Sequence, residues 1–292
     1  MDCELRRLSR RTVTSYGNNV ALFLQYAEQQ LQVTEIEKME KNHIRQYIKY
    51  LMRRGMAPSY INTILKSIRA LFKFALAEGY IKENPAEKVH WQSEGKVLIE
   101  TFTDEEVRSM LKVFTGSSYL SVRNRLIIAL AFDTGARNTE LCELQCDDVR
   151  KNIILIHGKG NKERHVPMTP YLRKLLLQYE RIKNHYFQNR QILYQNLLLS
   201  RTGKPLTKEA VERVFHMAGE KAKVRKEIRC SPHTARHYYA QSNLRNGLDV
   251  YSLSRLLGHE NINITKRYLQ SLQDESVVQM AMKTSPISNL QR

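Results

Sequence analysis

Residues 152–167 carry the clearest strand signal in this chain of 292 residues. Two runs with β-branched residues, Asn152–His157 and Lys162–Pro167, flank the glycine-containing turn Gly158–Asn161. Glycine adopts the backbone conformations that tight turns require, so this pattern predicts a β-hairpin. Most other apolar residues recur at helical spacing, and we therefore expect a mainly α fold with one small β-hairpin or sheet (α+β).

The first hundred residues favour a small helical bundle. Apolar residues recur at helical spacing from Tyr16 to Ala27. Asn42 can cap a second helix that ends at Gly55, and Pro58 can open a third that ends by Gly79. Asparagine is a preferred N-cap, proline fits the first helical turn, and glycine commonly follows the last.

The second part of the chain combines further helices with the hairpin. Thr103–Glu106 has the pattern of a capping box, and the apolar run Leu126–Phe132 predicts a helix buried on most sides. Further helices are expected at Tyr171–Ile182 and after Thr207. Periodicity fades after Pro85, which indicates a linker. We expect a helical domain at 1–85, a linker at 86–100, a mixed domain at 101–272 and a tail at 273–292.

Positive charge is concentrated in the second half of the chain. The protein has 47 Lys and Arg against 29 Asp and Glu, a formal net charge of +18. Residues 150–237 alone hold 20 basic and 6 acidic residues. Such a field attracts polyanions such as DNA or RNA, although a solvated basic surface would give the same composition. A basic membrane-surface protein is disfavoured because no single helix pairs a cationic face with a bulky apolar one.

Cysteine usage and hydropathy favour a cytoplasmic protein. The cysteines Cys3, Cys142, Cys146 and Cys230 form no Cys-x-x-Cys pair, and we expect reduced thiols. The N-terminal residues show no apolar segment typical of a secretory signal. The longest apolar run has seven residues, Leu126–Phe132, far fewer than a membrane span needs.

Five local patterns in the second domain contain residues that suit phosphate chemistry. They centre on Arg137, Lys159, the His233–Arg236 pair, His259 and Tyr268. Each has an ordinary structural explanation when taken alone, such as an exposed arginine at a helix start, a solvated turn lysine or a packing tyrosine. Their order and spacing are more informative than any one of them.

This ordered set resembles the tyrosine site-specific recombinases of the phage integrase family, in particular the short Xer-like members. The matching text is TGARNTEL at 134–141, HGKGNKERHVP at 157–167, HTARH at 233–237, LLGH at 256–259 and RYL at 267–269. Asn138, Ala235 and Tyr238–Tyr239 depart from the usual family residues at packing positions. The resemblance covers nearly the whole chain and implies a helical, SAM-like core-binding domain followed by a catalytic domain.

The resemblance implies DNA strand cleavage without hydrolysis. Tyr268 would attack the scissile phosphate, leaving a 3′-phosphotyrosyl link and a free 5′-hydroxyl. Arg137 and Arg236 would hold the non-bridging oxygens, because guanidinium groups offer fixed donors and keep their charge. Lys159 would be the general acid for the leaving oxygen.

The other site residues are given supporting roles by the same resemblance. His233 would help to deprotonate the tyrosine or donate to a phosphate oxygen, and His259 would donate to a non-bridging oxygen. Glu140, one helical turn after Arg137, would orient a cationic neighbour. No metal, cofactor or ATP is implied, since two arginines already supply the positive charge that Mg²⁺ would bring.

The implied partner is double-stranded DNA with a specific recombination site. Phosphate contacts are expected from a stripe on the third helix, from the hairpin and from a later helix: Lys66, Arg69, Lys73, Lys162, Arg164, Lys204 and Lys208. For the third-helix stripe, an ordinary solvated face explains the spacing equally well.

The family also implies an assembly and a location. Protomers that are monomeric in solution would form a homo-tetramer on synapsed DNA, with the tail segment Gln273–Met282 packed on a neighbouring protomer or folded onto its own domain. Accessory DNA-bending proteins would be further partners. We expect a nucleoid-associated, cytoplasmic protein that does not contact membranes.

Three functions remain open at this point. The resemblance favours a recombinase that integrates or excises a mobile element or resolves joined replicons. A type IB topoisomerase uses similar Arg, Lys and Tyr chemistry but needs no tetramer. A non-catalytic DNA-binding protein on the same fold is the third, and the complete set of reactive residues argues against it.

Overall fold

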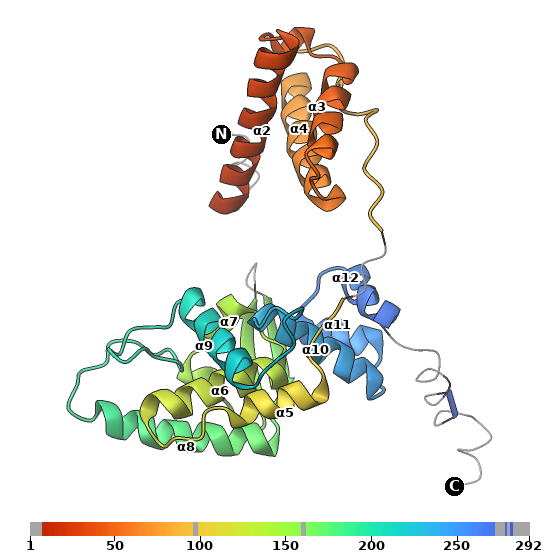
Figure 1. Cartoon of the computed structure of the whole chain (residues 1–292). Helices are drawn as coiled ribbons and strands as arrows, with labels where there is room; N and C mark the ends of the chain where they lie inside the picture. The colour runs from red at the N-terminus through yellow and green to blue at the C-terminus, as the bar shows by residue number, and fades with distance from the viewer. Residues whose placement is uncertain (1–7, 96–98, 159–161, 272–277, 279–280, 283–292) are drawn as a thin grey trace. The chain divides into compact units, whose positions relative to one another are not determined.

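The computed structural model describes residues 8–95, 99–158, 162–271, 278, 281 and 282 (Figure 1). The chain divides into two compact units, Met1–Val97 and Leu98–Arg292. The division falls inside the stretch expected to be a linker. As expected, the fold is mostly helical with one small antiparallel sheet of two strands.

The first unit is a helical bundle. Its elements are α2 (Arg10–Leu31), η1 (Ile36–Lys38), α3 (Lys41–Arg53) and α4 (Pro58–Ala77). A buried hydrogen bond of 3.0 Å from Asn19 Nδ2 to Ser67 Oγ joins α2 to α4. The prediction that Asn42 caps the second helix is wrong: Glu40 is the N-cap and forms a capping box with His43.

The segment after α4 packs on the first unit instead of hanging free. Asn62 on α4 makes two hydrogen bonds to the backbone of Gln92. Its Nδ2 donates to the Gln92 carbonyl at 3.0 Å, and its Oδ1 accepts from the Gln92 N–H at 2.8 Å. The Arg69 guanidinium lies 4.3 Å from the ring centre of Trp91 and donates to the carbonyl of Val89. Much of the expected linker is therefore part of this unit.

The second unit contains the hairpin and the remaining helices. In chain order these are α5 (Asp104–Lys112), α6 (Tyr119–Thr134), α7 (Asn138–Glu143), η2 (Cys146–Asp148), β1 (Ile153–Gly158), β2 (Lys162–Pro167), α8 (Pro170–Phe187), α9 (Lys208–Lys221), α10 (Pro232–Arg245), α11 (Val250–Leu257), α12 (Ile262–Lys266) and η3 (Arg267–Ser271). The predicted capping by Thr103 and Thr207 is present at α5 and α9.

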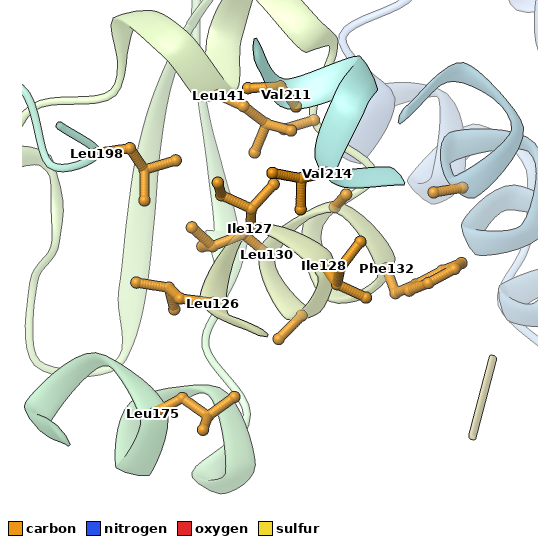
Figure 2. Packing of buried hydrophobic residues seen from close by; sticks show 14 of the residues in the cluster. Leu126, Ile127, Ile128, Leu130, Phe132, Leu141, Leu175, Leu198, Val211 and Val214 are labelled. Carbon is orange, nitrogen blue, oxygen red and sulfur yellow. The ribbon is translucent and has the colours of Figure 1, made fainter. Parts of the chain in front are cut away.

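Helix α6 lies at the centre of the second unit's core. Figure 2 shows Leu126, Ile127 and Leu130 of this helix surrounded by apolar side chains from α7, α8 and α9. The predicted run Leu126–Phe132 is buried along its whole length. Because α6 is fixed on all sides, its C-terminal end gives a rigid platform for the residues that follow it.

The hairpin forms at the predicted place, with β1 and β2 paired antiparallel and Ile154 opposite Val166. On β2, Arg164 and Val166 are buried, whereas the intervening His165 is exposed. Strand side chains alternate between faces, so Arg164 shares the inner face with Val166. The Arg164 side chain is therefore directed toward the interior of the second unit.

Within the part of the chain that the structure describes, no helix is both long and apolar enough to span a membrane. The same residues include no group of three or more His, Cys, Asp or Glu side chains arranged to hold a metal ion. The expected tail helix at Gln273–Met282 lies almost entirely outside the described residues.

Candidate active site

Arg137 is placed by the sharp end of α6. The helix ends at Gly135, which has a left-handed backbone (φ 60°), and a Cβ at this position would lie 2.5 Å from the Tyr239 ring. Only glycine meets both conditions without strain. The turn sets Arg137 as the N-cap residue of α7, with its guanidinium half-exposed.

Glu140 holds Arg137 in place, as the one-turn spacing predicts. Its carboxylate accepts from the Arg137 backbone N–H at 2.7 Å and from Nη1 at 2.8 Å. The Glu140 side chain is almost completely buried, and a buried carboxylate needs compensating charge.

Arg164 supplies that compensation, and this pairing replaces the phosphate contact expected of it from the sequence. Its Nη1 and Nη2 donate to the Glu140 oxygens at 2.9 and 2.7 Å, and its Nε donates to the Leu256 carbonyl at 2.7 Å. With only 8% of the residue exposed, Arg164 is directed inward. It thereby connects the hairpin to α7 and to the end of α11.

The charges around Glu140 decide its protonation state. Burial alone would raise the pKa of this carboxyl, but the hydrogen bonds and charge of Arg164, with the bonds from Arg137, lower the pKa to about 2. Glu140 is therefore ionised at neutral pH. The cluster Arg137–Glu140–Arg164 keeps one net positive charge, and Arg137 presents it outward.

Arg236 lies in the same region, on α10. It is 3% exposed and donates from Nη1 to the Gly135 carbonyl at 2.7 Å and from Nη2 to the Leu257 carbonyl at 2.6 Å. Burial, with the nearby charges of Arg137 and Arg164, lowers the pKa of Arg236 to about 10. The guanidinium still carries its charge at neutral pH, and the two carbonyls fix its orientation.

His259 contacts Arg236 directly. Its Nε2 lies 3.0 Å from Arg236 Nη2, and its Nδ1 lies 2.8 Å from Thr265 Oγ1. A guanidinium nitrogen can only donate, so we assign Nε2 as the acceptor and Nδ1–H as the donor to Thr265. Burial and the neighbouring arginines lower the pKa of His259 to about 4, in keeping with a neutral ring.

In this arrangement His259 Nε2 does not offer a proton to a phosphate oxygen. The expected donor role needs a proton on Nε2, with a phosphate oxygen in place of Arg236 as the partner of that nitrogen. The helix end predicted at Leu257–Gly258 is present, and Gly258 adopts a left-handed backbone (φ 64°) directly before this histidine.

Tyr268 lies in η3 with its side chain buried (4% exposed). Its hydroxyl is 2.9 Å from Nδ1 of His237 on α10. Burial raises the pKa of Tyr268, while the charges of Arg236, Arg267 and Arg137 act in the opposite direction. The phenol is thus neutral and lies within the field of two candidate arginines.

The sequence interpretation did not give His237 a role. The available signal was its position, next to Arg236 and one helical turn after His233, in HTARH. His233 itself is exposed, and its ring stands edge-on to that of His237 with 4.2 Å between the ring centres. The structure therefore places His237, and not His233, at hydrogen-bonding distance from the tyrosine hydroxyl.

The remaining candidate residues belong to α4, to the hairpin and to the region around the start of α9. Lys159 lies outside the described residues. Lys162 is exposed and pairs with Glu260 at 2.9 Å. Arg69 packs on Trp91, so the basic stripe on α4 presents Lys66 and Lys73 only. The last two expected contacts, Lys204 and Lys208, are exposed.

The arrangement suits the binding of a phosphodiester. Cations fixed by a buried carboxylate and by backbone carbonyls can stabilise the charge that develops on phosphate oxygens, because they need no reorganisation when the charge appears. A neutral imidazole with a lowered pKa, that of His237, lies beside the phenol, and a second one, that of His259, contacts Arg236. Such a set can transfer a phosphoryl group to an oxygen nucleophile.

Comparison with known protein families supports this interpretation. Residues 100–275 match the phage integrase family, and residues 1–81 match its N-terminal SAM-like domain. The chain is 30% identical over 271 residues to tyrosine recombinase XerC of Halalkalibacterium halodurans, covering 91% of this chain and 88% of that protein. It is 29% identical to tyrosine recombinase XerD of Staphylococcus haemolyticus, with 89% and 88% covered.

Solved structures share the fold. The XerH site-specific recombinase bound to palindromic difH substrate, in a post-cleavage complex, matches with a TM-score of 0.79 and 20% identity over 94% of this chain and 81% of that one. The Tn1549 transposon integrase in complex with transposon right end DNA matches with a TM-score of 0.74 and 18% identity over 97% and 96%.

Proposed function

The chain belongs to the phage integrase family as a Xer-like tyrosine recombinase, a site-specific DNA recombinase, and we propose that Tyr268 is the nucleophile that cleaves the DNA strand. The observation that carries this proposal is the contact between Tyr268 and His237, which is the sequence neighbour of Arg236 on α10. Helix α10 therefore contacts the Tyr268 phenol through His237 and also carries the buried cation Arg236. A bound phosphodiester could meet both.

The proposed step is a phosphoryl transfer. The Tyr268 oxygen attacks phosphorus, the bond to the 5′-oxygen breaks, and a 3′-phosphotyrosyl ester forms. The departing 5′-oxygen takes a proton from Lys159 and becomes a hydroxyl. Reversal with a 5′-hydroxyl of a partner strand completes the exchange. Since one ester replaces another, the reaction needs no ATP.

Arg137 and Arg236 are assigned to the non-bridging oxygens. Arg137 is half-exposed and oriented by Glu140, and Arg236 is oriented by two carbonyl groups. Removing one preorganised donor of this kind typically costs about 10²–10³ in rate. Alanine at either position should therefore slow cleavage far more than it weakens DNA binding.

Double-stranded DNA with a specific site is the proposed partner, bound by a homo-tetramer when two sites are synapsed. The exposed lysines Lys66, Lys73, Lys162, Lys204 and Lys208 are proposed phosphate contacts. Such contacts position the protein without specifying sequence, so each loss should weaken binding and reduce its salt dependence. With DNA as its substrate, the protein would act on the nucleoid in the cytoplasm.

Covalent capture from a random pool of DNA tests the proposal and identifies the recognition site in the same experiment. The protein is incubated with nicked duplexes of random sequence, and adducts that survive denaturation are amplified and sequenced. We expect a defined recognition sequence from the wild-type protein. Tyr268→Phe should bind the selected duplex in a gel shift and form no adduct. An adduct that persists in this variant would assign the nucleophile to another residue.

A further inference from the structure

We propose that His237 is a catalytic residue that accepts the hydroxyl proton of Tyr268 during strand cleavage. This inference rests on the proposed function, in which Tyr268 is the nucleophile. Its basis is the 2.9 Å contact between His237 Nδ1 and the Tyr268 hydroxyl, two groups 31 residues apart in the sequence. A general base must lie within hydrogen-bonding reach of the proton that it removes, and His237 meets this condition.

Geometry favours His237 over His233 as the acceptor. Both lie on α10, one helical turn apart, but His233 is exposed and contacts the His237 ring edge-on. The rings of His237 and Tyr268 lie 5.5 Å apart at an angle of 58°. This orientation suits a hydrogen bond in the imidazole plane better than stacking of the two rings.

The charges around His237 keep its ring unprotonated at neutral pH. His233 and Arg236 face it from α10, and Arg267 and Tyr268 face it from η3. Burial and the first three of these groups lower the pKa of His237 to about 4, so the ring is neutral. A neutral ring has one nitrogen free to accept, and we assign Nδ1 as that nitrogen, with the proton on Nε2.

Phosphate binding would change this balance at the required moment. The negative phosphodiester offsets the charge of Arg236, which otherwise opposes a cationic imidazole. As the Tyr268 oxygen bonds to phosphorus, its O–H bond breaks and the proton moves to His237 Nδ1, which forms an imidazolium. The imidazolium returns this proton to the phenolate oxygen when a 5′-hydroxyl attacks and releases the tyrosine.

His237→Asn separates proton acceptance from positioning. The asparagine amide oxygen can occupy the place of Nδ1 and accept a hydrogen bond, but it cannot take up a proton at neutral pH. We expect cleavage of the selected duplex to slow about 100-fold or more at pH 7, with the gel shift unchanged. His216→Asn on α9, an exposed histidine outside the site, is the matched control and should cleave at the wild-type rate.

A substrate with sulfur in place of the bridging 5′-oxygen distinguishes a base from an acid. The thiolate leaves without a proton, so this duplex should restore cleavage by Lys159→Ala, in which the leaving group lacks its acid. It should not restore His237→Asn, because the tyrosine must still lose its proton. Restoration of His237→Asn would overturn the proposal, as would a wild-type rate on the ordinary duplex.

The pH profile gives a further readout. The rate of wild-type cleavage should vary little between about pH 6 and 9. The rate of cleavage by His237→Asn should rise about tenfold for each pH unit, because hydroxide replaces the missing proton acceptor. Parallel profiles would contradict a role in proton transfer.

A measurement on the wild-type protein does not depend on any variant folding. In histidine-labelled protein, ¹⁵N spectra distinguish protonated from unprotonated ring nitrogens, and we expect His237 Nδ1 to be unprotonated. A proton on Nδ1 would overturn the proposal. The two failures can be told apart. If the proposed function is wrong, Tyr268→Phe retains the DNA adduct; if only the role of His237 is wrong, Tyr268→Phe still loses the adduct.

Discussion

Arg164 and Glu140 form a two-bond ion pair inside the second unit, with contacts of 2.9 and 2.7 Å and both side chains at most 7% exposed. The same carboxylate holds the guanidinium of Arg137. The hairpin strand β2 and helix α7, whose N-cap is Arg137, are therefore joined by one buried charge pair. This pair sets the orientation of a proposed phosphate-binding group.

Removal of the carboxylate charge tests the pair. Glu140→Gln leaves Arg164 buried with its charge uncompensated, and we expect the free energy of unfolding to fall by about 3 kcal/mol. Urea denaturation followed by circular dichroism at pH 7 measures this change. Glu143→Gln, an exposed position on the same helix, is the control and should change stability by less than about 0.5 kcal/mol. Equal effects would show that the pair does not stabilise the fold.

Acid should remove the contribution of Glu140. Its pKa is about 2 in the folded protein against an ordinary value of 4.5, so folding favours the ionised form. The resulting stability is complete above about pH 4.5 and is lost as the pH falls toward 2. The stability difference between wild type and Glu140→Gln should therefore narrow on acidification. If the difference in unfolding free energy stays constant from pH 7 down to the lowest pH at which both proteins are folded, the low pKa assigned to Glu140 is contradicted.

Gly135 offers a separate test of how Arg137 is placed. Alanine there combines an unfavourable left-handed backbone with a Cβ 2.5 Å from the Tyr239 ring, and we expect a loss of about 2 kcal/mol or more. Gly247→Ala has the same backbone problem (φ 94°) with no atom within 4 Å, so its loss should be near 1 kcal/mol. Thermal unfolding of both variants measures the difference. Identical losses would exclude a contribution from Tyr239.

Local signals in the sequence predicted several helix ends correctly, whereas α8 runs to Phe187, beyond the expected Ile182. Pro58 opens α4 and Thr103 caps α5 because these effects depend on neighbours within one turn. Asn42 failed as a cap because Glu40, two residues before it, is the N-cap and forms a capping box with His43. The usual capping box pairs Ser or Thr with Glu or Gln, so this pair was not recognised in the sequence.

The sequence offered candidate site residues, but the contacts among them could not be predicted from it. Arg164 was expected to contact phosphate, although Val166 marks the buried face of β2 and strand alternation places Arg164 on that face. The contacts between Arg69 and Trp91 and between His237 and Tyr268 join distant parts of the sequence. Nothing in the local pattern specifies such pairs, because they depend on how the helices pack.

Thr265 should act through His259. Its buried hydroxyl accepts from Nδ1–H and fixes Nε2 as the atom that faces Arg236. Thr265→Val removes the acceptor, and we expect cleavage to slow about tenfold while DNA binding is retained. Thr265→Ser keeps a hydroxyl and should recover most of the rate. If serine and valine behave alike, the hydroxyl does not orient His259.

The most direct measurement of the central claim is the identity of the residue that becomes linked to DNA. The trapped adduct is digested with trypsin and nuclease, and the modified peptide is sequenced by mass spectrometry. We predict a nucleotide joined through its 3′-phosphate to Tyr268. A nucleotide on any other side chain, or linkage through a 5′-phosphate, would contradict the account.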